Sequence, residues 1–171
     1  MIGRVTTLLA MLAGAAILVS TIGARPAPVY VWNASESVPL GLYRLQPAGK
    51  LAVTDLVAVE PPEPLATFLV ESGYLPRGVP MLKRVLALPG QVVCREGLTI
   101  AVDRIAVGEA RERDGSGRPL PVWRGCRVVA RSELFLMNSQ SPESLDGRYF
   151  GPIPATAIIG RALPVWTDEE D

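Results

Sequence analysis

The longest apolar run of the chain lies at its N-terminus. Residues 5–24 contain no charged side chain, and Arg4 stands directly before them. Twenty residues of helix, rising 1.5 Å each, span roughly 30 Å, the thickness of the hydrocarbon core of a bilayer. The run predicts an uncleaved membrane anchor, with a signal peptide removed after Ala24 and a buried core helix as the alternatives. Ile22 disfavours cleavage, because a small residue is preferred at that position.

Beyond this run, short apolar segments alternate with Gly- and Pro-rich turns, the pattern of β-strands. One segment, 63–72, lacks the alternation and predicts a short helix. The polar stretch 109–121 predicts a surface loop or hairpin tip. Strands are expected at 29–32, 41–45, 56–59, 82–88, 91–94, 98–102, 134–137 and 158–163. The sequence therefore predicts a mainly β protein with one N-terminal transmembrane helix, organised as anchor 1–24, linker 25–28 and β domain 29–171.

Composition excludes several classes of function. The chain has 17 basic and 17 acidic residues, so it lacks the excess of Lys and Arg that marks a nucleic-acid surface. It has no histidine and only two cysteines, too few soft ligands for zinc. We therefore expect no metal, no other cofactor and no nucleic-acid partner.

The cysteines, Cys94 and Cys126, bear on the compartment. The short N-terminal tail with its free amine favours a cytoplasmic N-terminus, which leaves the β domain outside the cytoplasm. Two cysteines outside the cytoplasm tend to pair. A Cys94–Cys126 disulfide is therefore one interpretation, and two unrelated buried thiols are the other.

Lysine is scarce in this chain: Lys50 and Lys83 are the only two, against fifteen arginines. Lys50 follows a turn, where a solvated charge is expected, whereas Lys83 lies within an apolar run. Strand alternation places Lys83 on the same face as Val85. Burial there lowers the pKa of the amine, which when neutral can act as a general base. The alternative is a lysine that extends from a strand edge into water.

Two serines, Ser35 and Ser37, precede Pro39 in a turn-rich stretch. Serines before a proline are usually turn formers. With no histidine available, however, a serine nucleophile would need a neutral lysine as its base. On an extended segment both hydroxyls point to one face, so Ser35 could donate to an oxyanion formed by attack of Ser37, beside the Ser37 backbone N–H.

Three segments resemble, in order, the motif boxes of the signal peptidase I superfamily. They are Ser-Val-Pro-Leu-Gly-Leu-Tyr at 37–43, Lys-Arg-Val-Leu-Ala-Leu-Pro-Gly at 83–90 and Ser-Leu-Asp-Gly-Arg-Tyr-Phe-Gly-Pro at 144–152. The resemblance covers essentially the whole chain, including the N-terminal anchor. It implies a membrane-tethered serine peptidase whose signal-peptidase-like β domain carries a Ser-Lys dyad.

The resemblance also assigns roles. Ser37 matches the nucleophile and Lys83 the general base, while Ser35 and the Ser37 amide match the oxyanion donors. Ser144 matches the hydroxyl that orients the lysine. Asp146 and Arg148 match a structural ion pair.

The spacing of the first motif narrows the resemblance. Ser37 and Pro39 are separated by one residue, where typical bacterial signal peptidases have two, and this is similar to the conjugative-transfer (TraF-type) peptidases that mature pilin subunits. The chain departs from the family pattern at Gln91, in place of an acidic residue, and at 136–139, Leu-Met-Asn-Ser, in place of Gly-Asp-Asn. These departures affect the expected substrate more than the chemistry.

The resemblance implies a peptidase of the inner membrane, single-pass, with its catalytic domain in the periplasm. Its partners would be the lipid bilayer and a membrane-inserted pilin precursor, which it would cleave or join into a ring. The alternatives are a general signal peptidase acting on secreted preproteins and a non-catalytic pilus-assembly component. A self-cleaving repressor would need a DNA-binding domain where this chain has its apolar run.

Overall fold

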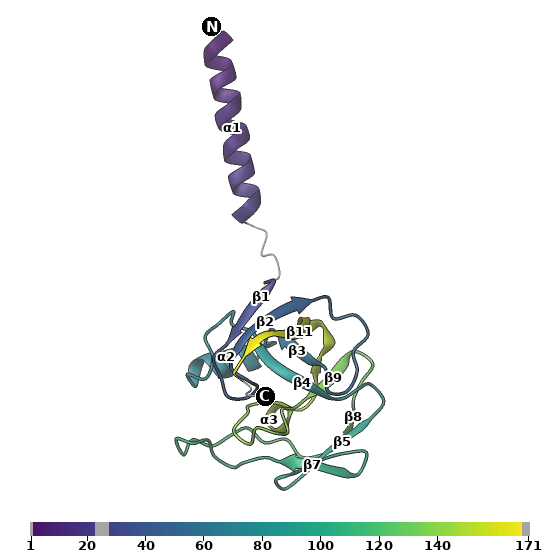
Figure 1. Ribbon diagram of the computed structural model, residues 1–171. Coiled ribbons are helices and arrows are strands. Elements are labelled where there is room, and N and C mark those ends of the chain that lie inside the picture. The colour runs from purple at the N-terminus through teal and green to yellow at the C-terminus, as the bar shows by residue number, and fades with distance from the viewer. Residues whose placement is uncertain (1, 23–27, 169–171) are drawn as a thin grey trace.

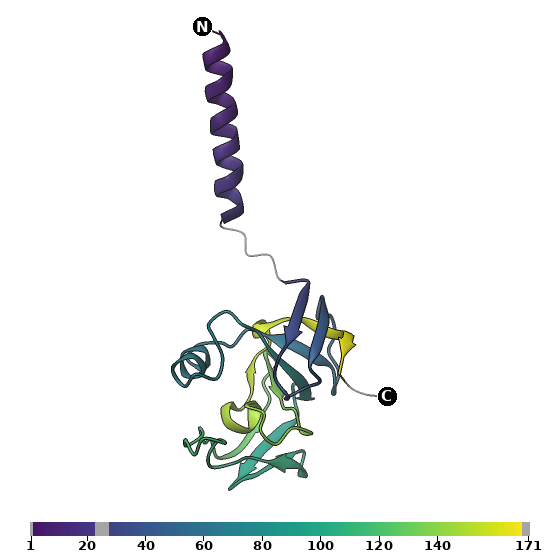
Figure 2. The same cartoon turned by 60° about the vertical axis from the view of Figure 1, so that its left-hand side comes forward.

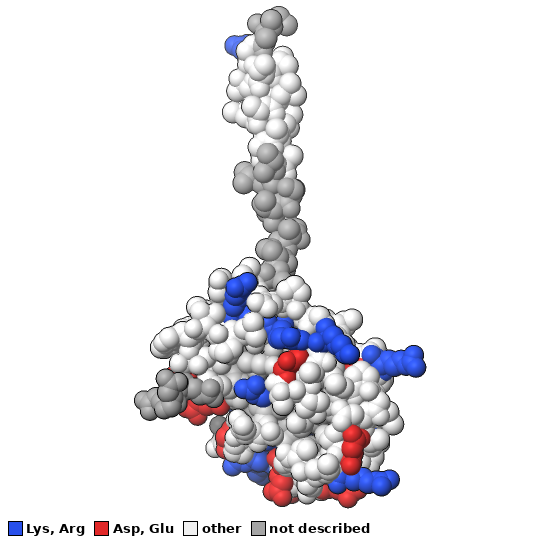
Figure 3. Space-filling view, turned by 45° about the vertical axis from the view of Figure 1, so that its right-hand side comes forward, with Lys and Arg blue, Asp and Glu red and all other residues white. Residues whose placement is uncertain are grey.

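The computed structural model describes residues 2–22 and 28–168. Helix α1 (Ile2–Ile22) stands apart from a β-rich body in both ribbon views (Figures 1 and 2). Its one charged residue is Arg4. In the space-filling view a basic side chain lies near the N-terminal end of the helix, and the rest of its described surface is uncharged (Figure 3). Judged by length and apolarity, no helix among the described residues qualifies as a membrane-crossing helix. Parts of the predicted anchor (23–24) and linker (25–27) lie outside the described residues, so both stay predictions.

The body is built from antiparallel strands in two sheets, which confirms the mainly β class. The larger sheet has the order β1 (Tyr30–Asn33), β2 (Gly41–Gln46), β11 (Ile158–Thr167), β3 (Leu56–Val59), β4 (Met81–Ala87), β9 (Glu133–Leu136) and β10 (Ile153–Pro154). The smaller sheet has the order β7 (Ile105–Glu109), β6 (Thr99–Val102), β5 (Val92–Glu96) and β8 (Gly125–Val128). The helical elements are α2 (Leu65–Glu71), α3 (Gly147–Phe150) and the 3₁₀ turn η1 (Ala155–Ala157).

Strands β3 and β4 form the buried centre of the larger sheet. All four residues of β3 are buried, as expected of an apolar run packed on both faces. From Lys83 onward β4 alternates: Lys83, Val85 and Ala87 are buried, whereas Arg84 and Leu86 are partly exposed. Leu82, at the start of the strand, is buried as well, in a separate hydrophobic cluster. The period-two pattern predicted from the sequence is therefore present, and it turns Lys83 inward.

Strand β9 lies between two hydrophobic cores. Leu134 and Leu136 pack into a core with the β3 and β4 valines. Phe135, and Met137 just after the strand, pack into the second core, with residues of the smaller sheet. Because successive side chains point to opposite faces, one strand serves both cores. The segment that follows β9 is thereby fixed from two sides.

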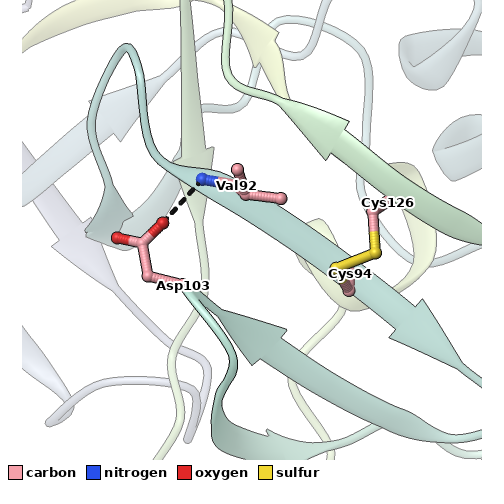
Figure 4. The surroundings of a disulfide bond; sticks show 4 residues. All are labelled: Val92, Cys94, Asp103 and Cys126. Carbon is pink, nitrogen blue, oxygen red and sulfur yellow. Dashed lines mark hydrogen bonds between the residues drawn. A yellow bond between two sulfur atoms is a disulfide. The ribbon is translucent and has the colours of Figure 1, made fainter.

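The smaller sheet carries the disulfide (Figure 4). Cys94 of β5 and Cys126 of β8 stand directly opposite each other, with their Cα atoms 4.0 Å apart, and are joined by a disulfide bond. Asp103, in the turn between β6 and β7, accepts a 2.8 Å hydrogen bond from the backbone N–H of Val92 in β5 (Figure 4). A covalent bond and a side-chain bond therefore tie β5 to its neighbours.

Every strand that the sequence pattern predicted is present, with ends shifted by up to a few residues. The predicted helix at 63–72 is present as α2. The polar stretch 109–121 forms a hairpin-like loop, closed by a bridge between Arg113 and Pro119. The sequence analysis missed β7, β8, β10 and α3.

Candidate active site

The connection between β1 and β2 carries the two serines. Ser35 Oγ and Ser37 Oγ lie 3.0 Å apart, within hydrogen-bond distance. Residues 35–38 form a turn, so the expectation of an extended segment was wrong, although the two hydroxyls do meet. Ser35 is exposed and Ser37 is half-buried, so an incoming group can reach both.

Asn33, the last residue of β1, holds this turn from inside. Its side chain is buried, and its Nδ2 donates to the carbonyl oxygens of Ser35, Val38 and Pro39 at 2.8, 2.9 and 3.0 Å. Its Oδ1 accepts from the backbone N–H of Ser35 at 3.3 Å and lies 3.0 Å from Ser35 Oγ. The Tyr43 hydroxyl donates to the Pro39 carbonyl at 2.7 Å. The sequence analysis missed both residues as supports of the turn.

Lys83 projects from β4 into the interior. It is only 6% exposed, and its Nζ donates a 2.8 Å hydrogen bond to Ser144 Oγ. Burial lowers the pKa of Lys83 to about 8, opposed by the nearby Asp146 carboxylate and reinforced by the Arg148 guanidinium. A measurable fraction of this amine is therefore neutral near pH 7, which an ordinary lysine does not achieve.

Asn138 fixes the backbone on both sides of Lys83. Its Oδ1 accepts a 2.9 Å hydrogen bond from the Arg84 N–H, and its Nδ2 donates to the Leu82 carbonyl at 3.1 Å. The side chain thus continues the sheet where β9 has ended, and it is itself buried. Asn138 drew attention in the sequence only as part of a departure from the family pattern, and its role comes from tertiary contact.

Asp146 and Arg148 form a buried ion pair beneath the lysine. The Arg148 guanidinium donates to both carboxylate oxygens at 2.9 Å, and the two side chains are 2% and 0% exposed. The Asp146 carboxylate also accepts from the backbone N–H groups of Asn138 and Arg148. Its charge is therefore met by hydrogen bonds as well as by its partner, as a buried carboxylate requires.

Arg148 organises the segment between β9 and α3. Its Nη2 donates to the carbonyl oxygens of Asn138, Ser141 and Ser144 at 3.3, 2.6 and 3.1 Å. Gly147 lies against β9, where a Cβ atom would come within 2.6 Å of the Leu136 carbonyl oxygen. Ser144 is thereby held at the position where its hydroxyl meets Lys83.

The serine turn and the lysine open onto one cleft of about 950 Å³. The cleft is lined by Trp32, Asn33, Ala34, Ser35, Glu36, Ser37, Leu69, Tyr74, Leu75, Pro76, Val79, Pro80, Met81, Leu82, Lys83, Gln140, Ser141, Pro142, Glu143, Ser144 and Leu145. Four predicted residues therefore share this cleft: Ser35, Ser37, Lys83 and Ser144. Asp146 and Arg148 lie behind it and support it.

The cleft has little charge. Its carboxylates are Glu36 and Glu143, and Glu143 pairs with Arg111. Among the described residues no cluster of three or more His, Cys, Asp or Glu is arranged to hold a metal ion. The remaining lining is mostly apolar or uncharged, which suits an uncharged extended peptide segment.

A mainly β body with two serines on an accessible turn and a buried amine of lowered pKa in the same cleft fits the class of serine peptidases. Comparison with known families agrees, because the model of the family "Signal peptidase, peptidase S26" matches residues 2–167. The chain belongs to this family.

Several relatives of the chain are named as conjugal or plasmid transfer proteins. It is 38% identical over 159 residues to a probable conjugal transfer protein TraF of Sinorhizobium fredii, covering 87% of this chain and 83% of the relative. It is 36% identical over 170 residues to conjugal transfer protein TraF of Agrobacterium tumefaciens, covering 93% and 95%. It is 31% identical over 173 residues to plasmid transfer protein TraF of Escherichia coli, covering 96% and 97%. These matches bear out the resemblance to the TraF-type branch.

Proposed function

We propose that this protein is a serine endopeptidase in which Ser37 is the nucleophile and Lys83 its general base. The observation that carries the proposal is the lysine itself, since Lys83 is 6% exposed, has a pKa near 8 and lies in one cleft with Ser37. A buried amine with a lowered pKa supplies the base that a chain without histidine otherwise lacks.

In the proposed cycle, the lone pair of neutral Lys83 takes the proton of Ser37 as Ser37 Oγ attacks a peptide carbonyl. Lys83 Nζ still donates to Ser144, which leaves its lone pair for Ser37. The Ser35 hydroxyl and the Ser37 backbone N–H stabilise the oxyanion, and removing one such donor costs about 3–4 kcal/mol. The Lys83 ammonium then returns the proton to the leaving amine, and an acyl-enzyme remains.

A second nucleophile completes the cycle. Water releases the acyl group as a carboxylic acid and restores Ser37, which gives simple cleavage. When an amine of the same substrate attacks instead, it forms a new peptide bond and closes a ring. In both cases Lys83 takes a proton from the attacking group and Ser37 regains its own.

The proposed substrate is a conjugative pilin precursor. The support is the set of relatives named as conjugal or plasmid transfer proteins, which align over 83%, 95% and 97% of their length. In this proposal the substrate binds in the cleft as an added β-strand, and small residues are preferred next to the scissile bond.

The proposed location is the cytoplasmic membrane, with residues 1–24 as a single-pass anchor and the β domain in the periplasm. Two observations support it: residues 5–24 lack charge, and Cys94 and Cys126 are joined in a disulfide. Disulfides persist in the oxidising periplasm and are rare in the cytoplasm. A tethered active site would lie at the height at which a membrane-inserted substrate presents its scissile bond.

Mass spectrometry of a candidate pilin precursor, incubated with the full chain in detergent micelles, tests the proposal. We expect loss of a terminal segment, and a further loss of one water where ring closure occurs. Ser37→Ala and Lys83→Arg should both abolish processing, because arginine keeps the charge but cannot act as a base. Processing by both variants would refute the dyad. Equal processing of unrelated secreted preproteins would instead indicate a general signal peptidase.

A further inference from the structure

The amide of Asn33 reaches the nucleophile through Ser35. The orientation of this amide is set by its surroundings, because its Nδ2 faces three carbonyl oxygens and its Oδ1 faces the Ser35 backbone N–H. The reversed orientation would place an oxygen against three oxygens. Oδ1 is therefore the atom that lies 3.0 Å from Ser35 Oγ.

This orientation decides where the serine protons lie. An amide oxygen only accepts, so the Ser35 hydroxyl is the donor in its contact with Asn33. A hydroxyl has a single proton, and in the 3.0 Å contact between the two serines Ser37 must then be the donor. In the resting turn, Ser37 therefore donates a hydrogen bond to Ser35, and Ser35 donates one to the Asn33 amide oxygen.

We propose that Asn33 is a positioning residue for the nucleophile and acts through the Ser35 hydroxyl. This inference rests on the proposed function of the same cleft. Asn33 holds Ser35 as an acceptor, which keeps Ser37 Oγ at one place in the resting turn. For the attack, the Ser37 O–H rotates from Ser35 toward the lone pair of Lys83, which takes the proton. Ser35 then turns its own O–H from Asn33 toward the oxyanion. The three carbonyl contacts of Asn33 keep the turn fixed during this exchange.

A double-mutant cycle tests the role. Asn33→Ala is compared with the unchanged protein and again in a Ser35→Ala background, with kcat and KM measured for pilin precursor cleavage by the full chain. We expect Asn33→Ala to lower kcat on the order of 100-fold with little change in KM, the loss that follows a nucleophile displaced by about 1 Å. In the Ser35→Ala background the same change should cost at most about a tenth of that factor, because residues acting in one chain are not additive.

Tyr43→Phe is the matched control, since it removes the other side-chain hydrogen bond to the Pro39 carbonyl of this turn without touching a serine. It should change kcat by no more than a few-fold. If Asn33→Ala does not fold, Asn33→Ser replaces it in the cycle, because serine is too short to contact both the Ser35 hydroxyl and the three carbonyls.

Each result separates this role from the proposed function. Equal fold-losses in the two backgrounds would overturn the role of Asn33 through Ser35, and so would a loss confined to KM. A Ser37→Ala enzyme that still cleaves would instead overturn the function itself.

Discussion

Lys83 Nζ donates a 2.8 Å hydrogen bond to Ser144 Oγ, although the two residues are 61 positions apart in the sequence. The lysine comes from the centre of the larger sheet, and the serine from the segment held by Arg148. The hydrogen bond aims a flexible side chain that would otherwise sample many rotamers.

Cleavage should depend on the protonation of Lys83. Because the pKa of this amine is lowered to about 8 by burial, the neutral base is scarce below that pH and predominant above it. We expect kcat/KM to rise about tenfold per pH unit below pH 8 and to level off above it. A pH profile of precursor cleavage measures this, and a rate independent of pH between 6 and 9 would contradict it.

Removing the Ser144 hydroxyl should impair the lysine without removing it. In Ser144→Ala, Lys83 Nζ loses the partner that orients it. We expect kcat to fall by about 10- to 100-fold, the scale of losses from misplaced catalytic groups. Ser141→Ala is the control, because Ser141 lines the same cleft and its contact to Arg148 comes from its backbone carbonyl. Equal losses of kcat in the two variants would mean that any change in the cleft lowers the rate, and that the hydrogen bond from Lys83 to Ser144 has no special role.

The buried Lys83 should lower the free energy of unfolding of the protein. Its pKa is lower in the folded protein than in the unfolded chain, so below pH 8 the charged form is buried at a penalty. Between about pH 8 and the ordinary lysine pKa the unfolded chain binds the extra proton, so the stability of the unchanged protein rises with pH there and the penalty fades.

Lys83→Met should therefore raise the free energy of unfolding by about 1–4 kcal/mol at pH 6 and by less at pH 10. Denaturant unfolding at the two pH values measures the difference. Lys50→Met, at the exposed lysine, should change stability little at either pH. A less stable Lys83→Met protein at pH 6 would show that the penalty is absent.

The ion pair between Asp146 and Arg148 should contribute strongly to the stability of the fold. Arg148→Met leaves a buried carboxylate without its partner, which costs about 3–5 kcal/mol. Arg77→Met removes an ion pair with Glu63 whose side chains are 64% and 55% exposed, and should cost no more than about 1 kcal/mol. Thermal unfolding of the two variants compares them. Similar losses would contradict the structural role of the buried pair.

The sequence predicted the lysine more securely than the serine turn. The alternation of β4 is a local property, and it was enough to place Lys83 on a buried face. The serines were expected on an extended segment, but the Asn33 amide competes for the backbone of residues 35–39 and folds them into a turn. That competition depends on a side chain buried by the surrounding sheet.

The elements and residues that the sequence analysis missed carry no local signal in the sequence. All four residues of β8 are exposed, so no hydrophobic pattern marks that strand, and its pairing with β5 places Cys94 opposite Cys126. Helix α3 is four residues long, too short for a helical period to show in the sequence. Asn138 likewise became a site residue only because β9 brings it beside β4.

The hydrogen bonds between the Asn138 amide and the backbone of Leu82 and Arg84 have a chemical consequence. If β4 slipped by one residue, the inward position would be taken by Arg84, a guanidinium that stays charged at every physiological pH. The cleft would then hold a permanent cation instead of an amine that can gain and lose a proton. Two hydrogen bonds of one buried amide therefore fix the register that places Lys83, the proposed base, and not the adjacent Arg84 in the cleft.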